Sequence, residues 1–379
     1  MIFKEKKYSI FILGPDNKML VRDAVASDDY FYFDPETKDI KWKVKILFLM
    51  TIYFLRIFIF NSSFISSLKS AYLTALIKVT SKDIAITAID NNIHFWRAAK
   101  ILHKKIRFIT IQNGTKFYEH PLMASNVDEM FIPELLCYGD YDKEKLSKSP
   151  AKVKTFYPVG SLYEMKAREV SEIYKAYKGG TRKLKYDLCL ISEDFTNWNS
   201  INPGLEETSG KVATFCFEYC KQNNLKMVIA LKNEPSSIKG KSEIKFLGKF
   251  IDIMDPLITL SSKDTWWSSY DLALQSKVSV GMASSLLIEN VSRGLKILIC
   301  DFYGPPWSLG VDDSLRLGPS KQSFEDFSAR ISQLLMQSDV DYLSSRIEQV
   351  KYLISHNDIT TEECIKSILN NSQSTYSLR

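Results

Sequence analysis

The chain has 379 residues, of which 45% are hydrophobic and 25% are charged, and this length is sufficient for two domains of the usual size. Its 15 glycines and 12 prolines are too few for a collagenous or low-complexity chain. The formal net charge of +6 excludes a histone-like polycation, and the whole excess of positive charge lies within residues 1–165. This first half therefore either contacts an anionic membrane surface or presents a solvated basic face.

The cysteines and the apolar runs indicate the cellular compartment in which the protein works. The 6 cysteines form no Cys-x-x-Cys pair and the 4 histidines are widely scattered, which argues against a zinc site and is typical of a reducing compartment. The start of the chain lacks the pattern of a signal peptide. The apolar run at 46–60 is interrupted by Arg56 and is too short to span a bilayer. We expect a cytoplasmic protein in which this run is a buried or interfacial helix, the latter giving peripheral contact with the inner membrane.

Short apolar runs alternate with helical patterns in the first half of the chain. β-branched and aromatic runs predict strands at 8–13, 84–89, 106–111, 135–138 and 155–158. One or two helices are expected at 43–79 and another at 94–103. Apolar strands separated by helices are typical of a parallel sheet that is covered on both faces.

The same alternation restarts after a polar helical segment. Residues 166–185, broken by Gly179 and Gly180, are the expected linker. Further strands are expected at 187–191, 226–231, 257–260, 277–280 and 296–300. Helices are expected at 210–222, 283–293, 323–337, 340–354 and 360–371. The sequence thus predicts an α/β chain of two doubly wound, Rossmann-like domains facing a cleft, with bounds 1–165 and 186–355 and a C-terminal helix and tail at 356–379.

One loop of the second half has the pattern of a phosphate-binding turn. The chain contains no GxGxxG and no GxxxxGK[ST] fingerprint. In open α/β sheets ligands bind beyond the carboxyl ends of strands, and there Gly281 is followed by Ser284 and Ser285, which open a helix with free N–H groups. Glu289, one turn later, can accept hydrogen bonds from sugar hydroxyls. The alternative is that the serines only cap the helix and Glu289 is a surface charge.

Two other loops of this half carry charged side chains after a strand. Lys232, Asn233 and Glu234 follow the run KMVIAL, where the lysine can face an anionic donor or the loop is a simple turn. The carboxylates of Glu193 and Asp194 follow the run DLCLI. One of them, with Asp194 favoured, can act as a general base or nucleophile, and the alternative is a pair of helix-capping acids.

Polar clusters also follow two consecutive strands of the first half. They are Asp90-Asn91-Asn92 and Gln112-Asn113-Gly114, with His120 further along the second loop. Carboxylate, amide and backbone groups suit the hydroxyls of a sugar, whereas an Asn-Gly pair alone is typical of a turn. A last candidate is the aromatic segment 265–270, ending at Tyr270, which either stacks on a base or sugar or packs in the core.

These loops, in this order, resemble a known group of enzymes. The stretch 84–160 (IAITAIDNNIHFWRAAK…FITIQNGTKFYEH…CYGDYDKE…YPVGSL) resembles bacterial surface carbohydrate biosynthesis proteins. The stretch 268–302 (SSY…VSVGMASSLLIENVSRGLKILICDF) resembles the donor half of GT-B glycosyltransferases. More narrowly, it is similar to capsule enzymes that use CMP-activated ulosonic acids, the Kdo and nonulosonate transferases. The resemblance covers residues from about 80 to 302.

The resemblance implies roles for particular residues. In these relatives a serine pair seats the donor phosphate, which implies the serines at 284–285, and a Lys-x-His-Pro segment faces the donor. That segment reads Lys232-Asn233-Glu234-Pro235 here, so glutamate replaces histidine. Some retaining Kdo enzymes use a carboxylate nucleophile near the start of the second domain, and Asp194 or Glu193 is the match.

The resemblance implies a GT-B glycosyltransferase that moves an ulosonic acid (Kdo, or a nonulosonic acid such as pseudaminic acid) from a CMP-linked donor to a surface or capsular polysaccharide. It implies a retaining reaction without metal or other cofactor. The expected partners are the nucleotide sugar, a glycan or lipid-linked glycan acceptor and an anionic membrane, and no nucleic acid. The alternatives are a UDP- or TDP-sugar GT-B transferase, a nucleotide-sugar epimerase, and a non-catalytic glycan-assembly protein.

Overall fold

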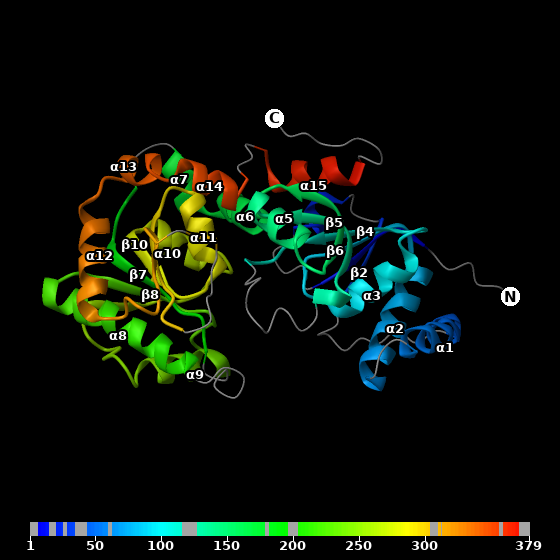
Figure 1. Ribbon diagram of the computed structural model, residues 1–379, viewed down its shortest axis with the longest axis horizontal. Coiled ribbons are helices and arrows are strands. Elements are labelled where there is room, and N and C mark those ends of the chain that lie inside the picture. Colours follow the sequence, from blue (N-terminus) through cyan, green and yellow to red (C-terminus); the bar gives the residue numbers. More distant parts are fainter. Residues whose placement is uncertain are drawn as a thin grey trace. The chain divides into compact units, whose positions relative to one another are not determined.

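The computed structural model describes residues 7–14, 20–25, 29–34, 44–59, 63–115, 127–178, 182–195, 204–303, 310–311, 313–355 and 359–370. The chain divides into two compact units (Figure 1). The first unit comprises Met1–Gly114, Pro121–Lys166 and Ser355–Arg379, and the second comprises Thr115–His120 and Ala167–Ile354. The segment expected as a linker, 166–185, contains the end of one helix and all of another. The expected C-terminal helix belongs to the first unit.

A parallel sheet of six strands organises the first unit, in the order β2-β1-β3-β4-β5-β6. All of its strand pairs are parallel. Its strands are β1 (Tyr8–Leu13), β2 (Tyr30–Phe33), β3 (Ser81–Thr87), β4 (Arg107–Ile111), β5 (Phe131–Cys137) and β6 (Lys152–Pro158). Because the chain moves from β1 to β2 on one side and then to β3 on the other, the strand order reverses at β1.

Helices cover both faces of this first sheet because side chains alternate along each strand. On β1, Ile10 and Ile12 point into one core, and Phe11 and Leu13 point into the other. The first core is closed by α6 (Leu162–Val170), α15 (Thr361–Asn370) and the short η1 (Arg22–Ala24). The second is closed by α1 (Val44–Phe58), α2 (Phe64–Thr80) and α3 (Ile93–Leu102).

A second parallel sheet of six strands organises the second unit, in the order β12-β11-β10-β7-β8-β9. Its strands are β7 (Tyr186–Ile191), β8 (Met227–Ala230), β9 (Ile258–Leu260), β10 (Ser276–Gly281), β11 (Lys296–Cys300) and β12 (Arg316–Leu317). β10 pairs with β7 on one side and β11 on the other, and both pairings are parallel. The strand order therefore reverses at β7, between β8 and β10.

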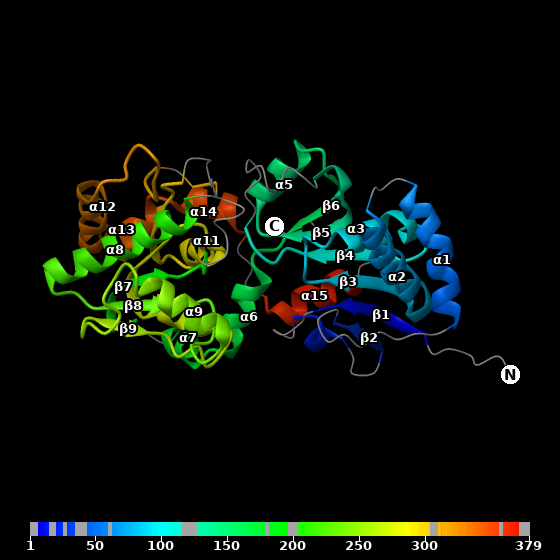
Figure 2. The ribbon, with the colours of Figure 1, turned by 90° about the horizontal axis from the view of Figure 1, so that it is seen from below.

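Helices flank the second sheet as well (Figure 2). α8 (Leu205–Asn223) and α12 (Phe324–Met336) contact each other and the sheet, and α10 (Ser268–Leu274) and α11 (Ser285–Ser292) form a second pair that also contacts it. The remaining helices of the described residues are η3 (Val127–Glu129), α5 (Asp140–Ser147), α7 (Glu172–Lys178), α9 (Ile238–Leu247), α13 (Asp339–Ser344) and α14 (Ile347–Leu353). All six cysteines are free and buried, as small apolar side chains in a core.

The expected strands are all present, with bounds that differ by a few residues. β2 and β12 were not expected, and neither were α5, α9 and α10. The helix expected at 340–354 is two helices, because Arg346 leaves the helical region with φ −133° between α13 and α14. None of the helices in the described part of the chain combines the length and apolar character that a membrane crossing needs.

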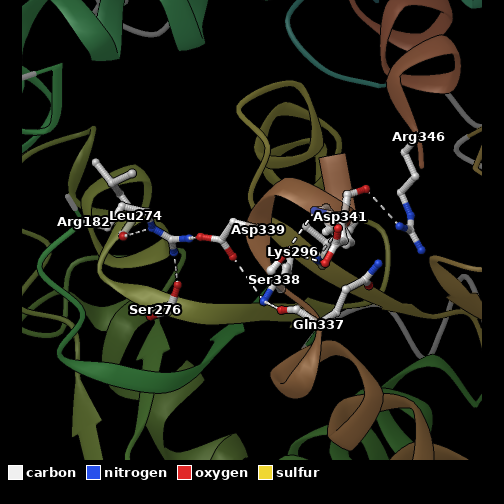
Figure 3. Close-up of polar contacts among 11 residues, drawn as sticks. Arg182, Leu274, Ser276, Lys296, Gln337, Ser338, Asp339, Asp341 and Arg346 are labelled. Carbon is white, nitrogen blue, oxygen red and sulfur yellow. Dashed lines mark hydrogen bonds and ion pairs between the residues drawn. The ribbon is translucent and has the colours of Figure 1, made fainter. Parts of the chain in front are cut away.

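A shared carboxylate attaches α13 to the amino edge of the second sheet (Figure 3). Asp339 lies 3.1 Å from the guanidinium of Arg182 and 3.1 Å from the ammonium of Lys296. The side chains of both cations are at least 93% buried, being only 7% and 6% exposed. Arg182 also donates to the carbonyl oxygens of Leu274, at the end of α10, and of Ser276, the first residue of β10. Two buried cations therefore depend on one carboxylate for charge compensation.

The substitution Asp339→Ala tests this dependence. It leaves the two buried cations without their common partner, and we expect the free energy of unfolding to fall by about 1–3 kcal/mol in urea titrations. Glu348→Ala is the matched control, since Glu348 pairs with Lys351 on the exposed surface of α14. There the loss should be below about 0.5 kcal/mol. Equal losses in the two variants would contradict the assignment.

Candidate active site

The carboxyl ends of β10, β7 and β8 meet at the point where the strand order of the second sheet reverses. Three loops leave the sheet there, beginning after Ile191, Ala230 and Gly281. Ligands of doubly wound sheets bind at such reversal points, because neighbouring loops separate there. The candidate residues of the second half therefore lie on adjacent loops.

Glu193 connects two of these loops through its carboxylate. Its Oε1 accepts hydrogen bonds from the backbone N–H groups of Met282 at 3.2 Å and Ala283 at 2.6 Å. Burial raises the pKa of the Glu193 carboxyl to about 7, although the N–H groups and the ammonium of Lys232 favour its charged form. The turn before α11 thus binds an anionic oxygen, supplied here by the protein itself.

The two serines of this turn have different partners. Ser284 is the N-cap of α11, with its Oγ accepting from the backbone N–H of Leu286 at 3.3 Å. The Oγ of Ser285 accepts from the backbone N–H of Thr115, which belongs to the second unit, at 2.8 Å. Ser284 therefore caps the helix, as the alternative interpretation of the serines expected. Ser285 instead binds Thr115, which is distant in the sequence.

Asp194 and Asn233 join the loops that follow β7 and β8. The amide of Asn233 donates to the Asp194 carboxylate at 2.8 Å. Asp194 has φ 51°, in the left-handed region that non-glycine residues rarely adopt. Its carboxylate is thus held by a specific partner on a constrained backbone, which is the kind of positioning that a reacting group needs.

The buried carboxylate of Glu243, on α9, holds the 232–234 loop in place. It accepts from the backbone N–H groups of Lys232 at 2.9 Å and Asn233 at 3.0 Å, and from the hydroxyl of Ser192. Sequence reasoning missed Glu243. The only available signal was an acid on the apolar face of an amphipathic helix. Gly240 allows α9 to approach, because a Cβ there would lie 1.9 Å from the carbonyl oxygen of Glu234.

The charged ends of the 232–234 loop are exposed. The ammonium of Lys232 donates to the carbonyl oxygen of Glu193 at 3.1 Å, so it lies near the turn that binds the carboxylate. Glu234 is exposed and accepts from Ser236. An exposed cation beside an anion-binding turn can compensate negative charge on a ligand.

Glu289 and Tyr270 form a buried pair between α11 and α10. The Tyr270 hydroxyl donates to the Glu289 carboxylate at 2.8 Å, and the two residues are 7% and 2% exposed. Glu289 is therefore not a surface charge, which corrects that alternative. Trp266 packs edge to face on Tyr270, with ring centroids 6.1 Å apart, so part of the aromatic segment packs against its neighbours.

The candidate residues of the first half lie on two loops that follow the carboxyl ends of β3 and β4. These strands are paired in parallel, so both loops start at the same end of the first sheet. Gln112 is buried and internally bonded: its amide donates to Gly114 and Asp142, and its oxygen accepts from Tyr138. The carbonyl oxygen of Asp90 accepts from the Trp96 indole, and Asn92 caps α3. Asn91 and Asn113 are exposed. His120 lies outside the described residues.

Glu243 offers a direct test of how the 232–234 loop is held. Glu243→Ala leaves two backbone N–H groups without acceptors, and we expect the free energy of unfolding to fall by about 2–5 kcal/mol. Glu243→Gln retains one acceptor oxygen and should lose less. Lys245→Ala, on the exposed side of the same helix, is the control and should change stability by less than about 0.5 kcal/mol. Chemical denaturation measures all three, and a Glu243→Ala value equal to the control would refute the role.

Comparisons with known proteins identify the fold. No protein family matches the sequence, and no curated protein matches it significantly. Among solved structures, UDP-GlcNAc 2-epimerase from Methanocaldococcus jannaschii in complex with UDP-GlcNAc and UDP is similar, with TM-score 0.57, 11% identity, and coverage of 95% of this chain and 98% of that one. An α,α-trehalose-phosphate synthase (UDP-forming) from Burkholderia vietnamiensis has TM-score 0.52, 10% identity, and coverage of 96% and 98%. The chain therefore has the two-domain, Rossmann-like GT-B fold, as its sequence predicted.

Proposed function

We propose that this chain is a glycosyltransferase that moves an ulosonic acid, either Kdo or a nonulosonic acid such as pseudaminic acid, from a CMP-linked donor to a surface or capsular polysaccharide. We propose further that the reaction is retaining and metal-independent, and that the protein is cytoplasmic. The GT-B fold, which nucleotide-sugar transferases and epimerases share, supports the coarser part of this assignment. The resemblance of the serine loop to CMP-sugar enzymes supports the choice of donor.

The observation that carries the proposal is the pair of hydrogen bonds from Met282 and Ala283 to the carboxylate of Glu193. A turn that binds one anionic oxygen at a sheet reversal point has the donors that a nucleotide phosphate requires. A phosphate bound there takes the position of this carboxylate. Because the pKa of Glu193 is about 7, its carboxyl is half neutral near pH 7 and leaves the N–H groups at low electrostatic cost.

The chemistry assigns separate tasks to the neighbouring groups. The bond between the anomeric carbon and the phosphate oxygen breaks, and its electron pair leaves with CMP. The carboxylate of Asp194 attacks the oxocarbenium-like carbon and forms a covalent intermediate. An acceptor hydroxyl then attacks the same carbon, releasing the Asp194 carboxylate and passing its proton to water, so that configuration is retained. The N–H groups of the turn and the ammonium of Lys232 stabilise the charge that develops on the leaving phosphate.

In this proposal the acceptor binds to the first unit. The exposed amides of Asn91 and Asn113, on loops that leave one edge of the first sheet, can bind sugar hydroxyls. We propose a growing glycan on a lipid carrier as the acceptor, which requires the protein to work in peripheral contact with the anionic inner membrane.

A second candidate function is a UDP- or TDP-sugar transferase or a nucleotide-sugar epimerase. The specific observation in its favour is that the similar solved structures include a UDP-GlcNAc 2-epimerase with bound UDP-GlcNAc and UDP. Incubation with the donor alone distinguishes an epimerase from a transferase, because only an epimerase converts the sugar without an acceptor.

Nucleotide binding and sugar transfer test the proposal together. We expect CMP to raise the melting temperature more than UDP, GDP or TDP, because binding to the folded state alone stabilises it. A CMP-ulosonate should then transfer its sugar to a capsular oligosaccharide, and Asp194→Asn should reduce the rate by about 100-fold or more. Asp252→Asn, an exposed acid in the same unit, is the control.

Each other outcome points elsewhere. A shift with UDP and none with CMP would overturn the donor. Unchanged transfer in Asp194→Asn would remove that residue from the reaction. Full function of Asp194→Asn and of the Ser284→Ala/Ser285→Ala double variant in polysaccharide assembly would indicate a non-catalytic assembly protein.

The pH dependence of CMP binding tests whether the phosphate of CMP displaces the Glu193 carboxylate from the turn before α11. Ionised Glu193 competes with phosphate for the N–H groups, so affinity should fall as pH rises above about 7, by at most about tenfold per pH unit. Glu193→Gln has no carboxylate to ionise, and its affinity should stay flat between pH 7 and pH 8.5, which calorimetry measures. Parallel pH profiles for the two proteins would refute the competition.

A further inference from the structure

The outer face of the α1–α2 hairpin carries a cluster of exposed apolar side chains, here called the hairpin face. Its members lie on α1, directly after it and at the start of α2. Exposed fractions reach 67% for Phe48, 75% for Ile59 and 66% for Ile65. The full set is Leu47, Phe48, Ile52, Leu55, Phe58, Ile59, Phe64 and Ile65.

The hairpin face is additional to what the core requires. The opposite side of α1 is already buried, since Ile46 and Ile57 are 1% and 7% exposed. Ile46 belongs to the second core of the first sheet, and Met50 packs against that core. The exposed members recur every three or four positions, which places them on one stripe of the helix. α1 lies outermost beyond α2 in both views of the first unit (Figures 1 and 2).

Aromatic rings fix the end of the hairpin where its helices meet. Phe54 and Phe58 stack with ring centroids 5.2 Å apart, and Phe64 of α2 packs edge to face on Phe54 at 5.1 Å. The apolar side chains of the two helices therefore form one continuous surface. Such a surface in water is costly unless a partner covers it.

The charge on this segment identifies the partner. Residues 44–80 contain Lys45, Arg56, Lys69 and Lys78 and no acidic residue. The pKa of Lys78 is lowered, first by burial and then by the charges of Lys105, Lys7 and Lys45, which shows that cations gather beside the hairpin. Apolar side chains bordered by cations match a lipid surface with anionic headgroups.

We propose that the hairpin face is a membrane-binding surface, which lies in the headgroup region of an anionic bilayer with α1 parallel to the membrane plane. The 15 residues of α1 give a length of about 22 Å, shorter than the roughly 30 Å hydrocarbon core, so the helix lies on the membrane and does not cross it. A second copy of the chain fits less well, since the segment has no carboxylate to pair with Arg56 or Lys69 of that copy.

This inference rests on the proposed function in one respect: a lipid-linked acceptor would explain why the protein binds a membrane. Its test needs no sugar. The purified protein is floated with vesicles of phosphatidylcholine alone or of phosphatidylcholine mixed with anionic phosphatidylglycerol, at low and high salt. We expect flotation with the anionic vesicles at low salt, and weaker flotation at high salt.

Paired variants separate the hairpin face from general stickiness. Phe48→Ser/Leu55→Ser should weaken vesicle binding by about tenfold or more, since it removes two inserting side chains. Ile238→Ser/Met254→Ser removes two similarly exposed apolar side chains of the second unit, which are 90% and 83% exposed, and should bind as the parent does. Circular dichroism and thermal melting confirm that each variant is folded.

Three outcomes would overturn the inference. One is a parent protein that fails to float with anionic vesicles at low salt. Another is a folded Phe48→Ser/Leu55→Ser variant that floats like the parent. The third is a parent dimer in analytical ultracentrifugation that this variant converts to monomer, which would assign the hairpin face to self-association. CMP binding and sugar transfer in solution are measured separately, so failure here leaves the proposed function standing.

Discussion

Parallel pairing of β7 with both β8 and β10 is the constraint on which the candidate site depends. It places three loops at one edge of the second sheet, although their residues are separated by about 40 to 90 positions in the chain. The carboxylate of Glu193 then meets the N–H groups before α11, and Asp194 meets Asn233. None of these contacts is local, so each depends on the pairing of the strands.

Much of the fold could be predicted because its strands are buried on both faces. Runs such as KILIC and KMVIAL have no polar side to present, and a parallel sheet covered by helices is the arrangement that accepts them. β2 was missed because its sequence, YFYF, is only four residues long and lies beside segments without a clear hydrophobic period. α10 was missed because its start, at Ser268, looks like a binding loop rich in tryptophan.

The sequence predicted the positions of the candidate residues on loops after strands, but not the contacts that these residues make. The rule that ligands bind beyond strand ends selected Glu193, Asp194, Lys232 and the serine pair, and these do lie on neighbouring loops. Which partner each side chain takes could not be predicted, since that depends on tertiary packing. Glu243 supports the loop from a helix that no motif marked, and Gln112 is used internally where a sugar contact was expected.

The return of α15 to the first sheet affects the order in which the chain can fold during synthesis. Ile365 and Ile368 complete the same core as Ile10 and Ile12, which are made more than three hundred residues earlier. Domains generally fold as units while the ribosome is still translating. The second unit is nearly continuous from Ala167 to Ile354 and can therefore fold before α15 is made. One face of the first sheet stays incompletely covered until residues 361–370 have been synthesised.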